Sequence, residues 1–198
     1  MCSSDLLSEY GPPGNYYERQ IGRWSKQYRA TETEALADMD ALMARLPGRI
    51  PAPDGQRTLV HGDYRIDNMI FAAEGARCLA ILDWELSTIG HPYADLAAMV
   101  MQWHMPEGEE GRGLAGFDRA ANGLPGDAEF VAAYCARRGL DGIPDFGFYL
   151  AFCFFRLAAI LQGVKKRALD GNASNPELGL RYASVIPQLA SKGLEALG

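Results

Sequence analysis

The stretch His61-Gly62-Asp63-Tyr64-Arg65-Ile66-Asp67-Asn68, followed by Ile81-Leu82-Asp83-Trp84-Glu85, is the most informative part of this chain. An aspartate stands five residues before an asparagine, and a second aspartate closes an apolar run. Phosphoryl transfer from ATP uses this set of side chains. One carboxylate accepts the proton of the attacking hydroxyl, while an amide oxygen and a second carboxylate hold Mg²⁺ against the phosphates. The motif therefore predicts the catalytic half of a small-molecule kinase that uses ATP and Mg²⁺.

Each oxygen-bearing side chain of the motif has a predicted role. Asp63 is the predicted general base, which orients a substrate hydroxyl for in-line attack. Asn68 and Asp83 are the predicted cofactor-binding residues, because hard oxygen ligands suit magnesium. Glu85 follows Asp83 by two residues and is placed to hold a second metal ion or a water.

Three further polar residues accompany the base. Arg65 supplies a fixed positive charge that could steady the transferred phosphoryl group. His61 is grouped with the catalytic residues, although bracing the loop by hydrogen bonds suits it better than a reaction of its own. Asp95 opens a helix, where a cap or a loop anchor is a better interpretation than catalysis.

The apolar runs around the motif predict its geometry. Thr58-Leu59-Val60 is a short strand that leads into His61. Residues 69–72 and 78–82 are two further strands with a turn at 73–77, which is typical of a β-hairpin. A tight hairpin would bring Asn68, at the start of one strand, beside Asp83, at the end of the next.

The rest of the chain is predominantly helical, so the predicted fold class is α+β with one small catalytic hairpin. Ile21, Trp24 and Tyr28 share one face of a helix predicted over 16–30. A second helix is predicted over 33–46, with Thr31 or Thr33 as its N-cap. Residues 87–92 are predicted to form a loop. Further helices are predicted over 93–104, 127–138, 145–169 and 176–197.

Residues 146–164 are apolar enough to resemble a membrane span. Arg156 stands at the centre of this stretch, where a charge is costly in lipid. The stretch is therefore predicted to be a buried core helix. A buried guanidinium requires compensation, so an internal acidic partner is expected for Arg156.

Composition places the chain among ordinary globular proteins. It has 198 residues, of which 48% are hydrophobic and 22% charged, and its formal net charge is −6. This size suits one domain with a sizeable core. Lysine and arginine are scattered, which argues against a nucleic-acid partner, and no membrane partner is expected. Four widely spaced cysteines and no visible signal peptide favour a cytoplasmic location.

Gly111-Arg112-Gly113-Leu114-Ala115-Gly116 fits the G-x-G-x-x-G pattern of nucleotide-binding loops. That pattern requires a buried strand before it, and the acidic, glycine-containing residues 105–110 cannot supply one. A phosphate-covering loop of a kinase should also precede the catalytic aspartate. The segment is therefore predicted to be a flexible surface loop.

With these motifs in view, the chain resembles the aminoglycoside phosphotransferase and choline kinase family, which has the protein-kinase fold. More narrowly, it is similar to the kinase-like domain that is fused to some acyl-CoA dehydrogenases. The segments that carry the resemblance are YYERQIGRWSKQYRA (16–30), HGDYRIDNMIF (61–71), ILDWELSTIGHPYADLA (81–97) and FRLAAILQGVKKRA (155–168). The resemblance implies that Asp63 is the base, that Asn68 and Asp83 bind magnesium, and that Arg65 takes the place of the catalytic-loop lysine. It also implies a hydroxyacyl-CoA as a candidate acceptor.

The chain departs from the family before the motif. Family members carry an N-terminal lobe with a β-sheet, a phosphate-covering loop and a lysine that contacts ATP. The segment before His61 predicts two helices instead, so we expect a C-terminal lobe over 7–198 that lacks its N-lobe. Residues 1–6 do not resemble the family and are expected to be non-native or disordered. Alone, such a fragment would be inactive.

Two classes of function remain open from the sequence. The first is a phosphotransferase with an alcohol acceptor, whose partners are a nucleotide, the alcohol and the missing N-lobe. The second is a non-catalytic, pseudokinase-like binding module. An apolar face left exposed by the missing lobe would also favour homo-oligomers.

Overall fold

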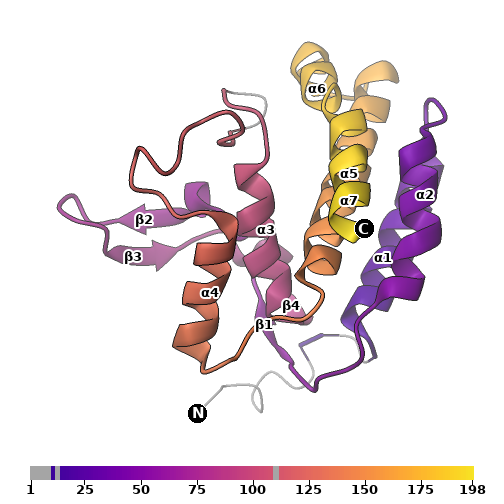
Figure 1. Ribbon diagram of the computed structural model, residues 1–198. Coiled ribbons are helices and arrows are strands. Elements are labelled where there is room, and N and C mark those ends of the chain that lie inside the picture. Colours follow the sequence, from indigo (N-terminus) through magenta and orange to yellow (C-terminus); the bar gives the residue numbers. More distant parts are fainter. Residues whose placement is uncertain (1–9, 12–13, 109–111) are drawn as a thin grey trace.

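The computed structural model describes residues 10–11, 14–108 and 112–198. The expectation for residues 1–6 lies outside these residues. A helical body contains most of the described chain, and two small antiparallel sheets stand beside it (Figure 1). The helices are α1 (Tyr16–Thr31), α2 (Ala37–Arg45), α3 (Tyr93–Trp103), α4 (Asp127–Arg138), α5 (Phe146–Leu169), α6 (Pro176–Ala183) and α7 (Ile186–Leu197).

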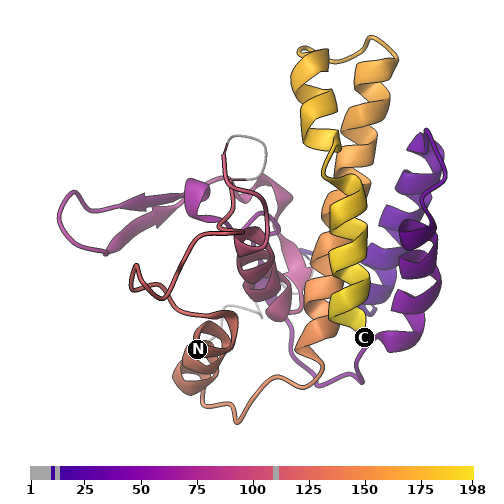
Figure 2. The same ribbon diagram turned by 45° about the horizontal axis from the view of Figure 1, so that its top comes forward.

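Helix α5 is the centre of the body. It packs against α1, α3, α6 and α7, while α2 covers α7 on the outer side (Figures 1 and 2). Phe152, Phe155 and Ala158 of α5 are fully buried, and they form one core with Leu42 of α2 and Leu189 of α7. By length and composition α5 could cross a membrane, but 61% of its most apolar window is buried inside the protein. The prediction of a core helix over this stretch is confirmed.

The predicted hairpin is present. Strand β2 (Met69–Phe71) pairs with β3 (Cys78–Ile81) in antiparallel register, with Met69 opposite Ile81. It projects from the helical body at the left of Figure 1. Leu82 N–H donates to the Asn68 carbonyl at 2.8 Å, so the pairing continues to the two predicted magnesium ligands.

The prediction of a loop over 87–92 is wrong for the centre of this segment, which forms strand β4 (Thr88–Gly90). This strand pairs with β1 (Thr58–Val60), and Leu59 lies opposite Ile89. A Cβ atom on Gly90 would lie 2.6 Å from the ring of Tyr16, so the glycine lets α1 pack closely on the strand. Glycine and threonine suggested a turn, but a partner strand far away in the sequence determines the structure here.

Two helix boundaries also differ from the prediction. Helix α2 begins at Ala37, and neither predicted threonine caps it. The Thr31 hydroxyl instead donates to the Gln27 carbonyl at 2.9 Å, and the Thr33 hydroxyl accepts from Gln162 Nε2 at 3.0 Å. The helix predicted over 176–197 is two helices, α6 and α7. Pro187 lies in the first turn of α7, where it cannot donate a backbone hydrogen bond to α6.

Candidate active site

His61 follows β1 and holds the loop that contains Asp63. Its side chain is buried, with 1% of its surface exposed. Nδ1 accepts the Asp63 N–H at 3.2 Å, and Nε2 lies 2.8 Å from the Leu82 carbonyl oxygen. These partners require the proton on Nε2, because a carbonyl oxygen can only accept. Both ring nitrogens are therefore engaged, and the imidazole joins the loop to the end of β3, in agreement with the predicted bracing role.

Asp95, in the first turn of α3, is the anchor of the same loop. Its Oδ2 accepts from the His61 N–H at 2.7 Å, and its Oδ1 accepts from the Gly62 N–H at 3.0 Å. Burial raises the pKa of Asp95, and these two hydrogen bonds and the nearby charge of Arg156 oppose the rise. The structure supports the anchor interpretation of Asp95.

Gly62 is required between these contacts. Its φ is +84°, a conformation that residues with a Cβ rarely adopt. A Cβ atom there would lie 2.6 Å from the Leu86 carbonyl oxygen. The glycine thus lets the loop turn sharply beneath the segment that follows Asp83.

Asp63 and Asn68 are in direct contact. Asn68 Nδ2 donates to the Asp63 carbonyl at 2.9 Å and to Asp63 Oδ2 at 3.1 Å. Since the amide nitrogen faces Asp63, the amide oxygen is the group that remains for a cation. Asn68 ends a short 3₁₀ turn, Ile66–Asn68, which leads directly into β2.

Asp83 has a left-handed backbone, with φ 64° and ψ 53°. It directly follows Leu82, whose N–H is bonded to the Asn68 carbonyl. The backbone therefore brings Asp83 to the same end of the hairpin as Asn68. Left-handed residues other than glycine cost roughly 1 kcal/mol, and such strained residues cluster at functional sites.

The donor set is suitable for magnesium. Among the described residues, no three His, Cys, Asp or Glu side chains gather closely enough to hold a metal ion by themselves. Asn68 and Asp83, whose side chains carry an amide oxygen and a carboxylate, lie at one end of the hairpin and offer two hard oxygen donors. Mg²⁺ is commonly bound by one or two carboxylates together with substrate phosphates and water, so the pair fits this ion. Glu85 is exposed in the turn Trp84–Leu86.

Arg65 pairs with Asp67, a partner that the sequence pattern did not identify. Arg112 Nη1 also contacts Asp67 Oδ2, at 3.2 Å. Partial burial alone would raise the pKa of Asp67, but hydrogen bonds and charge from the two arginines outweigh it and lower the pKa. The described part of the G-x-G-x-x-G segment is thus a loop tied to the catalytic loop. Proximity of Asp67 to Arg65 in the sequence was the available signal, whereas nothing local indicated Arg112.

The expected acidic partner of Arg156 is not its hydrogen-bond partner. Arg156 Nη2 donates instead to the Gly62 carbonyl at 2.7 Å. A guanidinium can be compensated by a carbonyl dipole and an aromatic face as well as by a carboxylate, and sequence pattern does not distinguish these.

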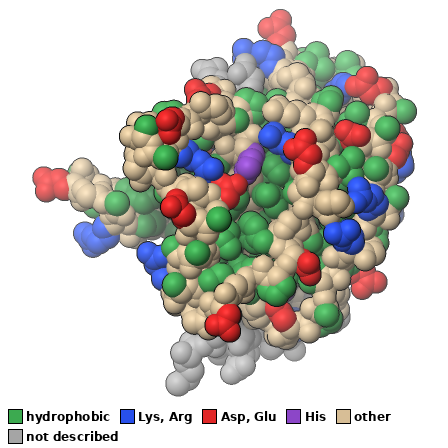
Figure 3. Space-filling model, viewed as in Figure 1, with side chains coloured by type: hydrophobic (Ala, Val, Ile, Leu, Met, Phe, Trp, Pro, Cys, Tyr) green, Lys and Arg blue, Asp and Glu red, His purple; other side chains and the backbone are tan. Residues whose placement is uncertain are grey.

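Large apolar side chains are exposed around the hairpin. Ile66 has 63% of its surface exposed, and Leu86 has 54%. The others are Ile70, Phe71, Leu79, Leu82 and Trp84. We call these seven residues the hairpin face, although Ile70 and Phe71, as neighbours in one strand, point to opposite sides of the hairpin. Figure 3 shows the hairpin projecting from the left edge of the molecule. Clustered apolar residues of this kind mark surfaces that contact another body.

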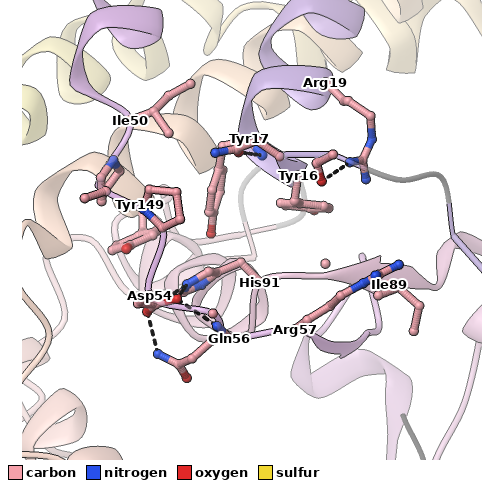
Figure 4. A pocket seen from close by; sticks show the side chains of 17 residues that line it. Tyr16, Tyr17, Arg19, Ile50, Asp54, Gln56, Arg57, Ile89, His91 and Tyr149 are labelled. Atoms are coloured by element: carbon pink, nitrogen blue, oxygen red, sulfur yellow. Dashed lines mark hydrogen bonds and ion pairs between the residues drawn. The ribbon is translucent and has the colours of Figure 1, made fainter. Parts of the chain in front are cut away.

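Two depressions lie away from the predicted residues. One, of about 220 Å³, lies at the opposite end of β1 from Asp63, and His91, Asp54 and Tyr149 are among its lining (Figure 4). Asp54 is 3.2 Å from His91 Nε2. The other is an apolar groove of about 580 Å³ beside α4 (Figure 3), with Phe146 and Leu150 in its wall. The motif residues do not line either depression.

Comparisons with known proteins agree with this arrangement. The family model "Phosphotransferase enzyme family" matches residues 4–149, which include the whole motif. The chain is similar to a solved structure from Ralstonia eutropha that is described as an aminoglycoside phosphotransferase. The TM-score is 0.90 and the identity 47%, and the match covers 96% of this chain and 58% of that one.

Curated relatives are longer than this chain. Mouse acyl-CoA dehydrogenase family member 10 is 45% identical over 85% of this chain, and mouse family member 11 is 39% identical over 96%. The chain spans only 16% and 24% of their respective lengths. The predicted resemblance and the predicted fold class are both confirmed. The chain belongs to the phosphotransferase enzyme family and has its kinase-like fold.

Proposed function

We propose that this chain is the catalytic lobe of a kinase that transfers the γ-phosphate of ATP to the hydroxyl of a small molecule. One observation carries the proposal. The Asn68 amide contacts Asp63, and the Asn68 carbonyl is bonded to Leu82, the residue before Asp83, so three residues with oxygen-bearing side chains lie at one end of the hairpin. Family membership supports the same reaction class.

Each residue of the motif has its own role in this proposed reaction. Asp63 accepts the proton of the acceptor hydroxyl and orients its oxygen for attack. The Asn68 amide oxygen and the Asp83 carboxylate hold magnesium, and Glu85 assists from the following turn. Bound magnesium supplies positive charge that neutralises the nucleotide phosphates. Arg65, directed by Asp67, places a further positive charge near the transferred group.

A hydroxyacyl-CoA is the acceptor that we favour. The support is indirect: two of the chain's close relatives are acyl-CoA dehydrogenase family members, in which the matching segment is part of a longer protein. A kinase module joined to an acyl-CoA enzyme would act on a compound of the same class.

The hairpin face is the surface on which we place a nucleotide-covering lobe. Leu82 and Trp84 of this face flank Asp83 in the chain, and Ile66 stands two residues before Asn68. The solved relative matches nearly all of this chain and is itself longer. Without such a lobe the same face would promote self-association, which size-exclusion chromatography detects.

The test is ADP release from magnesium-ATP with a panel of hydroxyacyl-CoAs, choline and an aminoglycoside. It is run on this chain and on the chain extended by the segment encoded immediately upstream. We expect turnover with a hydroxyacyl-CoA, only in the form that carries the covering lobe. Nucleotide binding without turnover on any acceptor would favour the non-catalytic binding module. Absence of both binding and turnover would refute the proposal.

Replacement of Asp83 separates its metal role from its backbone strain. Asp83→Gly should raise the free energy of unfolding by up to about 1 kcal/mol, because the strain that glycine relieves at φ 64° exceeds the entropy that it adds to the unfolded chain. The same variant should lose Mn²⁺ binding, measured by electron paramagnetic resonance with Mn²⁺ as the probe. Asp83→Asn is the matched control, since asparagine tolerates this backbone and keeps an oxygen but loses the charge. Unchanged Mn²⁺ affinity in both variants would contradict the assignment.

A further inference from the structure

Arg156 is the only charged residue within the apolar stretch 146–164, and its side chain is directed at the catalytic loop. Its Nη2 donates to the Gly62 carbonyl at 2.7 Å. None of the ion pairs found between described residues involves Arg156. The charged group in the middle of the central helix therefore donates a hydrogen bond to the backbone carbonyl next to the predicted base.

Helix α1 holds the guanidinium in place. The carbon at the centre of the Arg156 guanidinium lies 5.7 Å from the centroid of the Trp24 ring. Trp24 is buried, and its Nε1 donates to Gln20 Oε1 at 3.0 Å. A cation over an indole face is favourable, and the fixed ring restricts where the guanidinium can lie. Gln20, Trp24 and Arg156 thus form a connected set of contacts from α1 through α5 to the loop.

The carbonyl that Arg156 holds belongs to the peptide unit between Gly62 and Asp63. The N–H of the same unit donates to His61 Nδ1 at 3.2 Å. Both polar groups of this peptide are therefore fixed, one from each side. A fixed peptide plane limits φ of Asp63, and φ determines where its Cα–Cβ bond points.

We propose that Arg156 is a positioning residue that fixes the Gly62–Asp63 peptide plane and thereby aims the Asp63 carboxylate. The inference rests on the proposed function, because the orientation of the Asp63 carboxylate affects the reaction only if Asp63 is the base. Asp95 holds the two N–H groups that precede this peptide, and Arg156 holds the carbonyl that follows them. Arginine suits the position because its planar fork can bond a carbonyl while its face lies on a ring.

The first test measures the peptide plane without requiring activity. Amide hydrogen exchange is followed by NMR in the chain as it stands, for Arg156→Met and Arg156→Lys. Methionine keeps the apolar stem and a similar helix propensity but has no donor. Arg167→Met is the matched control, because Arg167 is exposed on the same helix. We expect exchange of the Asp63 amide to rise about ten- to a hundredfold in Arg156→Met, as for loss of a charged hydrogen bond.

Arg156→Lys keeps the charge but lacks the fork, so a smaller rise is expected. Buried amides of α7, such as that of Leu189, should exchange as in the control. An equal rise at Leu189 would mean general destabilisation and would overturn the proposal, as would an Asp63 amide that behaves as in Arg167→Met.

The second test uses whichever form of the protein turns over. Arg156→Met should lower kcat about tenfold or more while leaving the KM for magnesium-ATP unchanged, because a wrongly oriented base slows the chemical step and not nucleotide binding. A rise in KM alone would overturn the positioning role. If no form of the protein turns over, the proposed function fails, whereas the exchange test still decides whether Arg156 fixes the loop.

Discussion

Asp63→Asn is expected to lower kcat for phosphoryl transfer by about 10²–10⁴-fold, the usual contribution of a general base. Asparagine has nearly the same shape, and its side-chain oxygen can still accept from Asn68 Nδ2, as Asp63 Oδ2 does at 3.1 Å. The loop should therefore keep its conformation, and the KM for magnesium-ATP should stay the same. Steady-state ADP release and the melting temperature measure the two effects separately.

Asp141→Asn is the control for this experiment, since Asp141 is an exposed carboxylate between α4 and α5. It should leave kcat at the wild-type value. If Asp63→Asn keeps more than about a tenth of the wild-type kcat, below the usual base contribution, Asp63 is not the base. A large loss of melting temperature would instead indicate that the carboxylate holds the loop together.

Local patterns account for the features that the sequence predicts correctly. The hairpin follows from two short apolar runs around a turn, and its pairing alone brings Asn68 near Asp83. The predicted bounds of helix α4 agree with the observed ones, because a regular apolar spacing ends at the left-handed Gly139. The residues of the motif can be named from the sequence because they are close together in the chain.

Contacts between distant segments account for the features that the sequence does not predict. Strand β4 exists because β1 lies beside it, and its own residues suggested a loop. Arg112 reaches Asp67 across 45 positions, and Arg156 reaches Gly62 across 94. Burial arguments correctly required a partner for Arg156. They could not show that its hydrogen bond would go to the Gly62 carbonyl, while the Asp95 carboxylate interacts with it through charge alone.

Asp95→Asn is expected to lower the free energy of unfolding by about 2–4 kcal/mol. The Asp95 carboxylate accepts from two buried N–H groups, those of His61 and Gly62. Asparagine offers one oxygen, so its NH₂ group must face the second N–H, and that donor is left without an acceptor. Chemical denaturation measures the loss, with Asp141→Asn again as the control. An Asp95→Asn variant as stable as the control would show that the loop does not depend on this anchor.

Combining Asp95→Asn with Arg156→Met tests whether the two anchors act on one element. Asp95 holds the N–H of Gly62, and Arg156 holds its carbonyl. Once either contact is lost, the backbone of Gly62 is free to rotate. The remaining contact then contributes less to the free energy of unfolding than it does in the wild type. The free energies of unfolding lost in the two single variants should therefore add up to more than the loss in the double variant. The difference should be about 0.5–1.5 kcal/mol, as is usual for residues that share a partner. Strict additivity would mean that the contacts are independent, and then the aim of Asp63 would not depend on both.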